Sequence, residues 1–310
     1  MTDMTIASTP AAPIAADRPR RPHEERAAWG LVAPAATLIV VILALPLVVV
    51  VVLSLTDYQL GAKLWRFVGL ANYADLAKDP VFWRSIANTA LYAVAVVAGS
   101  TGLGLAVALM LQGTGALAPL WRTIFFLPVM ASLVAMAIVW EFMLHPTFGL
   151  VNAVLGLVGV APMNWLQNGA TALPALAVIG VWQQFGFAMV LFLAGLSGIP
   201  TALYDAAEMD GAPSAWARFR LVTWPLLAPV TLFVVVISTI RSFQVFDTVH
   251  ALTRGGPNKA TEVLLYTMYA EGFEFFRTGR AAAIAVVFVA AMLVLTLTKV
   301  LVVEKRIPAR

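Results

Sequence analysis

The chain has 310 residues, of which 61% are hydrophobic and 12% charged, and its formal net charge is +4. A soluble domain has roughly 45–50% apolar and 25% charged residues, so this composition excludes one and indicates a membrane protein with spans throughout. The absence of cysteine excludes disulfides, thiolate metal sites and cysteine nucleophiles, and basic cytoplasmic ends explain the positive charge without a nucleic acid partner.

The N-terminal part of the chain is expected to be a tail followed by a span. Residues 1–28 are rich in Ala, Pro and Thr and contain four arginines but no apolar run, which is typical of a disordered tail. Residues 29–55 are apolar over about 27 positions, more than the roughly 7–15 of a signal-peptide core, and predict an uncleaved transmembrane helix. Pro34 and Pro46 are expected to kink this helix.

The remaining apolar runs complete an all-α polytopic membrane protein with six transmembrane helices. They predict spans over residues 86–111, 120–144, 173–196, 226–248 and 281–303. The apolar piece 151–160 is too short to cross a bilayer and is expected to lie at the membrane surface or to dip partway in. The transmembrane domain is therefore predicted over residues 29–303, with a short cytoplasmic tail over 304–310.

The distribution of Lys and Arg predicts the side of the membrane on which the chain ends lie. Six crossings place both termini on one side, where residues 1–28, 112–122, 197–224 and 299–310 carry four, one, two and four basic residues. On the other side, residues 57–85 and 250–280 carry four each and residues 145–173 none. Because cytoplasmic loops are enriched in Lys and Arg, both termini are expected on the cytoplasmic side of the cell inner membrane.

The stretch 200–225 is the longest polar interruption that also has the signals of ordered structure. It predicts a short helix over Asp205–Asp210, because its alanines favour a helix and the following Gly211 and Pro213 end it. A second short segment is expected over Ser214–Thr223. A small ordered helix outside the bilayer suits a part of the molecule that another protein grips.

Short motifs in this stretch and on both sides of it carry a family resemblance, and together they cover most of residues 30–303. They are Gly149-Leu150-Val151-Asn152, Leu193-Ala194-Gly195-Leu196, Asp205-Ala206-Ala207 with Asp210-Gly211-Ala212, Val222-Thr223-Trp224-Pro225, Phe243-Gln244-Val245-Phe246-Asp247, Thr253-Arg254-Gly255-Gly256-Pro257 and Thr261-Glu262-Val263-Leu264. This set resembles the ABC-importer permeases, and most of all their carbohydrate-uptake branch, the maltose and glycerol-phosphate permeases. The chain departs from the family pattern in having Asp205 for Glu, Trp224 for Leu and one extra residue between Gly211 and Val222.

The resemblance implies the fold of a type I ABC importer permease, with a cytoplasmic coupling helix between the fourth and fifth spans. Carried onto this sequence, the residues that couple it to an ATPase are Asp205, Ala206, Ala207, Asp210 and Gly211. The implied partners are a cytoplasmic ABC ATPase dimer, a second homologous permease subunit and an extracytoplasmic solute-binding protein. A homodimer of this chain stays open as an alternative to two different permease subunits.

The implied activity is transport by alternating access of a sugar or related polyol, driven by ATP. The sequence has no Lys-Ser/Thr phosphate loop, so the chain is not expected to be an enzyme, and ATP and Mg²⁺ would be bound by the partner ATPase. One alternative is an ABC permease for a non-sugar solute such as glycerol phosphate or a polyamine. The others are an ion-coupled secondary transporter using Glu141, Arg241 and Asp247, and an intramembrane enzyme, for which no catalytic constellation is found.

Polar residues within two predicted spans suggest a substrate chamber near the middle of the membrane. In the fifth span Ser238, Arg241, Gln244, Asp247 and Thr248 recur at steps of three and four, which places them on one helical side. An arginine at the bilayer centre costs about 2.5–3.5 kcal/mol, so it should face protein or water.

In the fourth span Gln183 and Gln184 lie at a similar depth, with Trp182, Phe185 and Phe187 close by. Amides could bind the hydroxyl groups of a polyol, and aromatic rings could bind its faces. The substrate path is therefore predicted to include Trp182, Gln183, Gln184, Arg241, Gln244 and Asp247. In the alternative interpretation these residues only fix the packing of the helices.

Other conspicuous residues favour simpler interpretations. Glu141 lies near the outer end of the third span and is expected to reach the interface, and the three histidines have no spacing that suits a metal. Gly99, Gly102 and Gly104 resemble a face for close helix packing. The turn at Gly255-Gly256-Pro257 would lie outside, within reach of a binding protein.

Overall fold

The computed structural model describes residues 22–113 and 115–304. Of the two predicted tails, residues 1–21 and 305–310 lie outside this range. Within it the chain is helical, and the only β pairing there is an isolated bridge between Thr56 and Phe67. The chain divides into two compact units, Met1–Val49 and Val50–Arg310, which are described separately.

The first unit is built from helix α1 (Pro22–Ile39), a π-helical segment η1 (Val40–Ala44) and the start of α2 (Leu45–Ser54). Trp29–Ser54 is long and apolar enough to cross a membrane, in agreement with the predicted first span. The helix begins earlier than predicted, because Pro22 occupies its first position, where a missing N–H costs nothing. Residues 22–28 are therefore helical rather than part of the tail.

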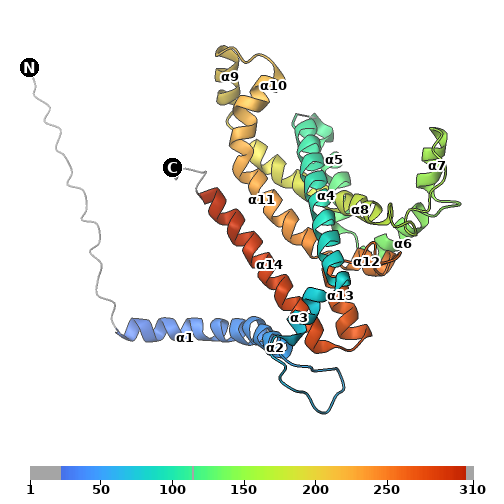
Figure 1. Cartoon of the computed structure of the whole chain (residues 1–310). Coiled ribbons are helices and arrows are strands. Elements are labelled where there is room, and N and C mark those ends of the chain that lie inside the picture. The colour runs from blue at the N-terminus through green and yellow to red at the C-terminus, as the bar shows by residue number, and fades with distance from the viewer. Residues whose placement is uncertain (1–21, 114, 305–310) are drawn as a thin grey trace, which may run out of the picture. The chain divides into compact units, whose positions relative to one another are not determined.

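Four long helices form the frame of the second unit (Figure 1). They are α4 (Pro80–Leu111), α8 (Ala172–Ser197), α11 (Trp224–Phe243) and α14 (Thr278–Glu304). Helix α4 starts within the loop predicted over residues 57–85, because the Asp79 carboxylate accepts a hydrogen bond from the Val81 N–H at 2.8 Å and caps it. The short helix α3 (Ala71–Lys78) precedes it in the same stretch.

The third predicted span is not one helix. It consists of α5 (Ala118–Met130), preceded by the 3₁₀ turn η2 (Gly115–Leu117), and α6 (Leu133–Met143), which is bent from α5 by 99°. The break has a local cause, since Pro128 lies inside the last turn of α5 and Ala131 is already extended. The described residues contain five helices that could each cross a membrane, or six spans if this bent pair counts as one.

The fifth predicted span is also interrupted. Helix α11 ends at Phe243, and α12 (Asp247–Leu252) starts after a break in which Phe246 is non-helical. An acidic residue in the first turn favours a new helix start at Asp247. The prediction that Asp247 and Thr248 share one helical face with Arg241 is therefore wrong, since that face ends with the helix.

The connecting segments contain the short helices. They are α7 (Leu150–Leu157), α9 (Thr201–Met209), α10 (Ala215–Arg218), α13 (Leu264–Tyr269) and the π-helical segments η3 (Phe219–Thr223) and η4 (Ala270–Glu274). Helix α7 occupies the short apolar piece after the third run, and α9 the predicted helix before Gly211. Helices α9 and α10 lie at one end of the second unit, here called the α9 end, while α3, α12 and α13 lie toward the other, the opposite end (Figure 1).

Small residues bring the long helices together. A Cβ on Gly104 of α4 would lie 2.7 Å from the Ala188 Cβ of α8, and one on Gly195 would lie 2.9 Å from Leu227 of α11. The predicted packing face of α4 is thus found at Gly99 and Gly104, whereas Gly102 faces open space. This close approach is how membrane helices gain packing energy where no hydrophobic driving force exists between them.

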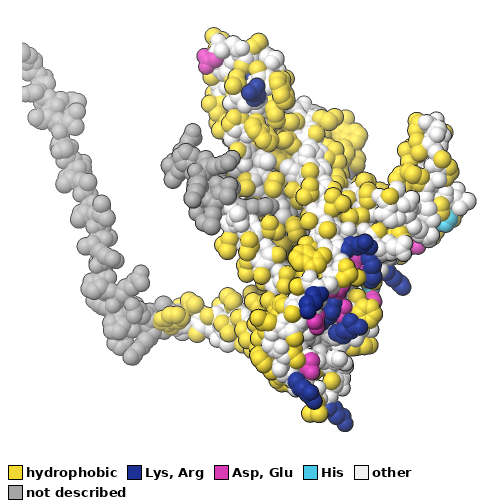
Figure 2. All heavy atoms as spheres, in the orientation of Figure 1, with side chains coloured by type: hydrophobic (Ala, Val, Ile, Leu, Met, Phe, Trp, Pro, Cys, Tyr) yellow, Lys and Arg dark blue, Asp and Glu magenta, His cyan; other side chains and the backbone are white. Residues whose placement is uncertain are grey.

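The surface of the second unit matches a protein in a bilayer. Figure 2 shows hydrophobic side chains along the length of the helices, while Lys, Arg, Asp and Glu gather at the opposite end. Four ion pairs lie there in two groups. One is Lys259–Glu262, and in the other Arg277 and Arg280 share Glu271 while Arg280 also pairs with Asp79. At the α9 end, a core of α4, α8 and α11 residues, centred on Phe192, Leu196 and Leu227, supports the short helices.

Candidate functional site

Helix α9 is held by local features of its own sequence. Pro200 provides the extended residue before the helix, and the helix ends at Asp210, whose N–H donates to the Ala206 carbonyl at 3.0 Å. Gly211 follows with φ +90°, a backbone conformation that residues with a Cβ adopt only with strain. The chain then reverses, and the Ala212 N–H donates to the Ala207 carbonyl at 2.9 Å.

The five predicted coupling residues lie on two different faces of this segment. Ala207 is half-buried and packs, with Tyr204, against the core of α4, α8 and α11. Asp205, Ala206, Asp210 and Gly211 are exposed. One face of α9 therefore attaches the helix to the transmembrane helices, and the other is free to contact a partner.

A second short segment braces α9 from the side. Ser214 caps α10 by accepting a hydrogen bond from the Ala217 N–H at 3.1 Å, and Arg218 of α10 pairs with Glu208 of α9 at 2.9 Å. The hydroxyl groups of Tyr204 and Thr223 are hydrogen-bonded at 3.1 Å, which joins α9 to the start of α11. Helix α9 is thus linked both to α10 and to the start of α11.

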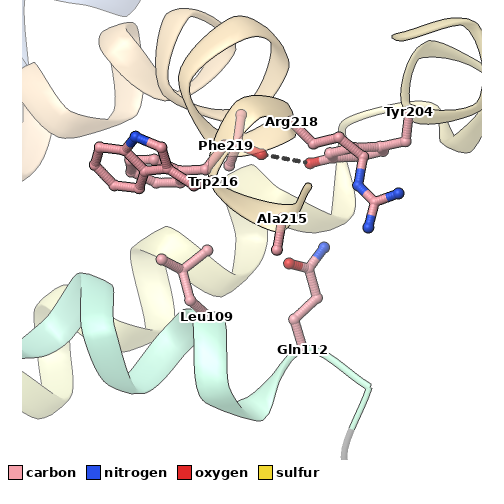
Figure 3. A pocket seen from close by; sticks show the side chains of 8 residues that line it. Leu109, Gln112, Tyr204, Ala215, Trp216, Arg218 and Phe219 are labelled. Atoms are coloured by element: carbon pink, nitrogen blue, oxygen red, sulfur yellow. Dashed lines mark hydrogen bonds between the residues drawn. The ribbon is translucent and has the colours of Figure 1, made fainter. Parts of the chain in front are cut away.

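Between these segments and the end of α4 lies a groove of about 580 Å³ (Figure 3). Leu109 and Gln112 come from the end of α4, and Ala215, Trp216 and Phe219 from α10 and η3. The rings of Trp216 and Phe219 stack with centroids 5.6 Å apart, and Trp216 is 71% exposed. Sequence analysis predicted the segment but not this groove, since the residues from α4 are remote in sequence.

A separate polar pocket of about 220 Å³ lies among the long helices. Four residues of the predicted substrate path line it, namely Gln183, Gln184, Arg241 and Gln244. The other two do not, because Trp182 packs edge-on against Trp140 with ring centroids 5.5 Å apart, and Asp247 lies beyond the end of α11.

The wall of this pocket includes two residues that the sequence analysis did not identify. Val129 and Leu133 come from the two sides of the break between α5 and α6. In the sequence, Pro128 and Ser132 could have indicated that break, but the apolar run that contains them was interpreted as one continuous helix. The bend thus brings backbone and side chains of the third apolar run to the polar residues of α8 and α11.

Arg241 is the only formally charged side chain among the residues that line this pocket. Its guanidinium carbon lies 4.2 Å from the centroid of the Phe187 ring, a cation–π contact. The Gln184 Oε1 atom is buried and has no hydrogen-bond partner among the residues described. The pocket therefore has both charge and hydrogen-bonding capacity to offer.

A third cavity, of about 400 Å³, lies beside α12. It is lined by Glu141 of α6 and His145 after that helix, by Asn164 and Gln167 of the loop before α8, and by the turn residues Thr253, Gly256 and Pro257. Thr261 secures that turn by donating a hydrogen bond to the Gly256 carbonyl at 2.6 Å. No cluster of three metal-ligating side chains occurs in residues 22–113 and 115–304.

Comparison with known proteins gives a consistent result. Residues 100–307 match the family described as binding-protein-dependent transport system inner membrane component. The chain is 36% identical over 275 residues to the inner membrane ABC transporter permease protein YcjO of Escherichia coli, covering 87% of this chain and 92% of that protein. It is also 36% identical over 274 residues to the lactose transport system permease protein LacF of Rhizobium radiobacter, covering 86% and 91%.

A further relative is the sn-glycerol-3-phosphate transport system permease protein UgpA of Agrobacterium fabrum, which is 33% identical over 247 residues and covers 78% of this chain and 82% of that protein. Among solved structures, a chain of a bacterial ABC transporter involved in the import of the acidic polysaccharide alginate aligns with a TM-score of 0.78 at 22% identity. That alignment covers 93% of this chain and 98% of the other. At this level of identity the likeness shows the fold alone.

Proposed function

This chain belongs to the family of inner membrane components of binding-protein-dependent transport systems, and from that premise we propose that it imports a sugar or related polyol by ATP-driven alternating access. The observation that carries the proposal is the division of α9 into two faces. Ala207 and Tyr204 attach it to the transmembrane core, while Asp205, Ala206 and Asp210 are exposed to a partner. A helix attached on one side and free on the other is suited to transmit an external force.

The proposed motor is a cytoplasmic ABC ATPase dimer, which binds ATP and Mg²⁺. Its closure would push α9, and the Arg218–Glu208 ion pair and the Tyr204–Thr223 hydrogen bond would carry the movement into α11. Helix α11 contains Arg241, so the same displacement would reach the polar pocket. A bistable rocking of packed helices would then expose the pocket alternately to the two sides.

The proposed orientation places the α9 end and both termini in the cytoplasm. The Lys and Arg side chains in the terminal segments 1–28 and 299–310 support this orientation, since these residues are enriched in cytoplasmic segments. The opposite end, with the cavity beside α12, would then receive the solute-binding protein. A second permease subunit, either homologous or identical, would complete the polar pocket.

A carbohydrate is the preferred cargo because one relative of this chain is named for lactose transport, whereas another is named for glycerol phosphate transport. The polar pocket supports this choice, since the amides of Gln183, Gln184 and Gln244 can each donate to and accept from hydroxyl groups. A glycerol-phosphate-like solute is the second candidate, favoured by the arginine in the same pocket.

Replacing Gln184 and Gln244 together by leucine should lower uptake roughly ten-fold, because about two hydrogen bonds of 0.5–1.5 kcal/mol each would be lost. Association with the ATPase should be unchanged, since both residues lie in the polar pocket and not on α9. Initial uptake rates and co-purification of the ATPase measure the two effects. Unchanged uptake and substrate range would show that the two glutamines only serve helix packing.

Reconstitution in vesicles tests the proposed function directly. Vesicles that hold this chain with its partner permease and ATPases should take up solute only when ATP and the binding protein are both supplied. Vesicles that hold this chain alone should show no uptake, with or without an ion gradient. Uptake by this polypeptide alone would contradict the proposal and favour an ion-coupled secondary transporter.

A further inference from the structure

Arg241 has no counter-ion among the residues that the structure describes. In residues 22–113 and 115–304 no carboxylate forms an ion pair with it, although four other arginine and lysine side chains of the same range are paired. Asp247, the acidic residue nearest to it in sequence, begins α12 after the end of α11 and does not line the pocket. The charge of Arg241 is thus uncompensated among the described residues, and Arg241 is exposed beside the pocket, within a predicted span where an unpaired charge is costly.

The surroundings of Arg241 favour an ionic contact between its guanidinium group and an acidic solute. Val129 and Leu133 form an apolar wall on one side of the pocket, and an ionic contact is stronger where such walls exclude water. Phe187 lies under the guanidinium at 4.2 Å, which limits the orientations of the group. A planar guanidinium presents its N–H groups as a fork that matches a carboxylate or a phosphate.

The other polar groups add donors and no negative charge. Gln183, Gln184 and Gln244 contribute amide N–H groups to the lining, and neither Asp nor Glu is among the lining residues. The volume of about 220 Å³ is smaller than the roughly 300–1,000 Å³ of a complete ligand site. It suits one acidic group or one sugar unit, with the rest of the solute held by the second subunit.

We propose that the imported solute is acidic, and that Arg241 binds its carboxylate or phosphate within the membrane. This inference rests on the proposed transport function and adds the charge of the cargo to it. Its competitor is a structural role, because Arg241 lies in the last turn of α11, where a cation is favourable to the helix dipole.

The test compares matched solutes in vesicles that hold the complete importer with its binding protein. Galacturonate is paired with galactose, and glycerol 3-phosphate with glycerol, so that each pair differs in its acidic group. The wild type should take up an acidic member and not its neutral partner, and which one it takes up tells a carboxylate from a phosphate. Arg241→Gln should lower that uptake ten-fold or more, while Arg241→Lys, which keeps the charge but not the fork, should lie in between.

Arg122→Gln is the matched control, since it makes the same change at an exposed arginine on α5 that does not line the polar pocket and should leave uptake unchanged. The melting temperature of each complex separates the two roles, because loss of a structural cation would lower it in Arg241→Gln, whereas loss of a contact to the solute would not. Uptake of a neutral member only, uptake of no member, or equal uptake by wild type and Arg241→Gln would overturn the inference. ATPase activity stimulated by the binding protein reports importer function independently, so a stimulated complex that moves no acidic solute contradicts this inference alone.

Discussion

Ala206→Trp should abolish uptake while the chain stays folded. Ala206 is exposed on the free face of α9, so the indole would project toward the partner and not into the protein's own core. Overpacking a close-fitting contact costs about 1–3 kcal/mol, and each 1.4 kcal/mol is ten-fold in affinity, so binding of the ATPase should weaken by about five-fold to a hundred-fold or more. Co-purification of the ATPase and initial uptake rates measure the loss.

Two other alanines serve as controls, because they lie in helices of the same unit but not on the free face of α9. Ala74→Trp makes the same change at an exposed helical alanine on α3, at the opposite end, and should leave ATPase binding intact. Ala207→Trp should instead lower the melting temperature, because Ala207 packs against the core of α4, α8 and α11. Normal uptake by Ala206→Trp would show that this face of α9 contacts no motor, and the proposed coupling would be rejected.

A substitution of Gly211 would test the same segment in a second way, through the backbone conformation rather than through a side-chain contact. Its φ of +90° strains any residue that has a Cβ, although open space surrounds the position. A bulky substitution there would distort the chain reversal that returns α9 to the core. Its effect should therefore combine loss of docking with local destabilisation, which makes Ala206→Trp the cleaner variant.

Arg280→Leu should lower the free energy of unfolding by about 3 kcal/mol or more, because it leaves carboxylates without their cation. Arg280, at the start of α14, makes an ion pair with Asp79 and a second one with Glu271 at 3.3 Å. The side chains of Arg280 and Asp79 are each 20% exposed, and that of Glu271 is 10% exposed. Asp79 also caps α4, so one arginine ties together α3, α4, η4 and α14.

Arg277→Leu is the matched control for this prediction. Arg277 pairs with the same Glu271 at 3.6 Å but its side chain is 55% exposed, so its removal should cost only about 0–1 kcal/mol. Thermal unfolding followed by tryptophan fluorescence should separate the two variants clearly. In a double-mutant cycle, Asp79→Asn should cost much less in the Arg280→Leu background than in the wild type. Equal effects of Arg280→Leu and Arg277→Leu would mean that burial adds nothing to this network.

Sequence reasoning performed best where the relevant interactions are local. The run 173–196 and helix α8 agree within one residue at each end, and the helix before Gly211 is present as α9. Length, hydropathy and capping residues determine such elements almost alone. The same reasoning failed at the 99° bend between α5 and α6, and it missed the short break between α11 and α12, although Ala215–Leu252 as a whole still qualifies as one candidate span. Hydropathy measures burial in lipid and reports neither a bend nor a short break in a helix.

The polar pocket was predicted only in part, for the same reason. Helical spacing identified Arg241 and Gln244, and depth in the membrane added Gln183 and Gln184. Asp247 was assigned by continuing a helix that in fact ends, and Val129 and Leu133 were not found because they belong to the bend. Spacing along a helix can thus place residues on a face, but it cannot tell how far that face continues.

The sequence by itself determined the class of the protein, since 61% hydrophobic residues in long runs can only be buried in a bilayer, and its motifs carried the family resemblance. It also located the segment on which the proposed coupling depends. Only the tertiary structure decided which side of α9 is free, that the third apolar run is bent, and that Arg241 has no carboxylate partner in the described chain. These properties depend on which surfaces of distant helices meet, and close packing against a neighbour leaves no local signal in the sequence.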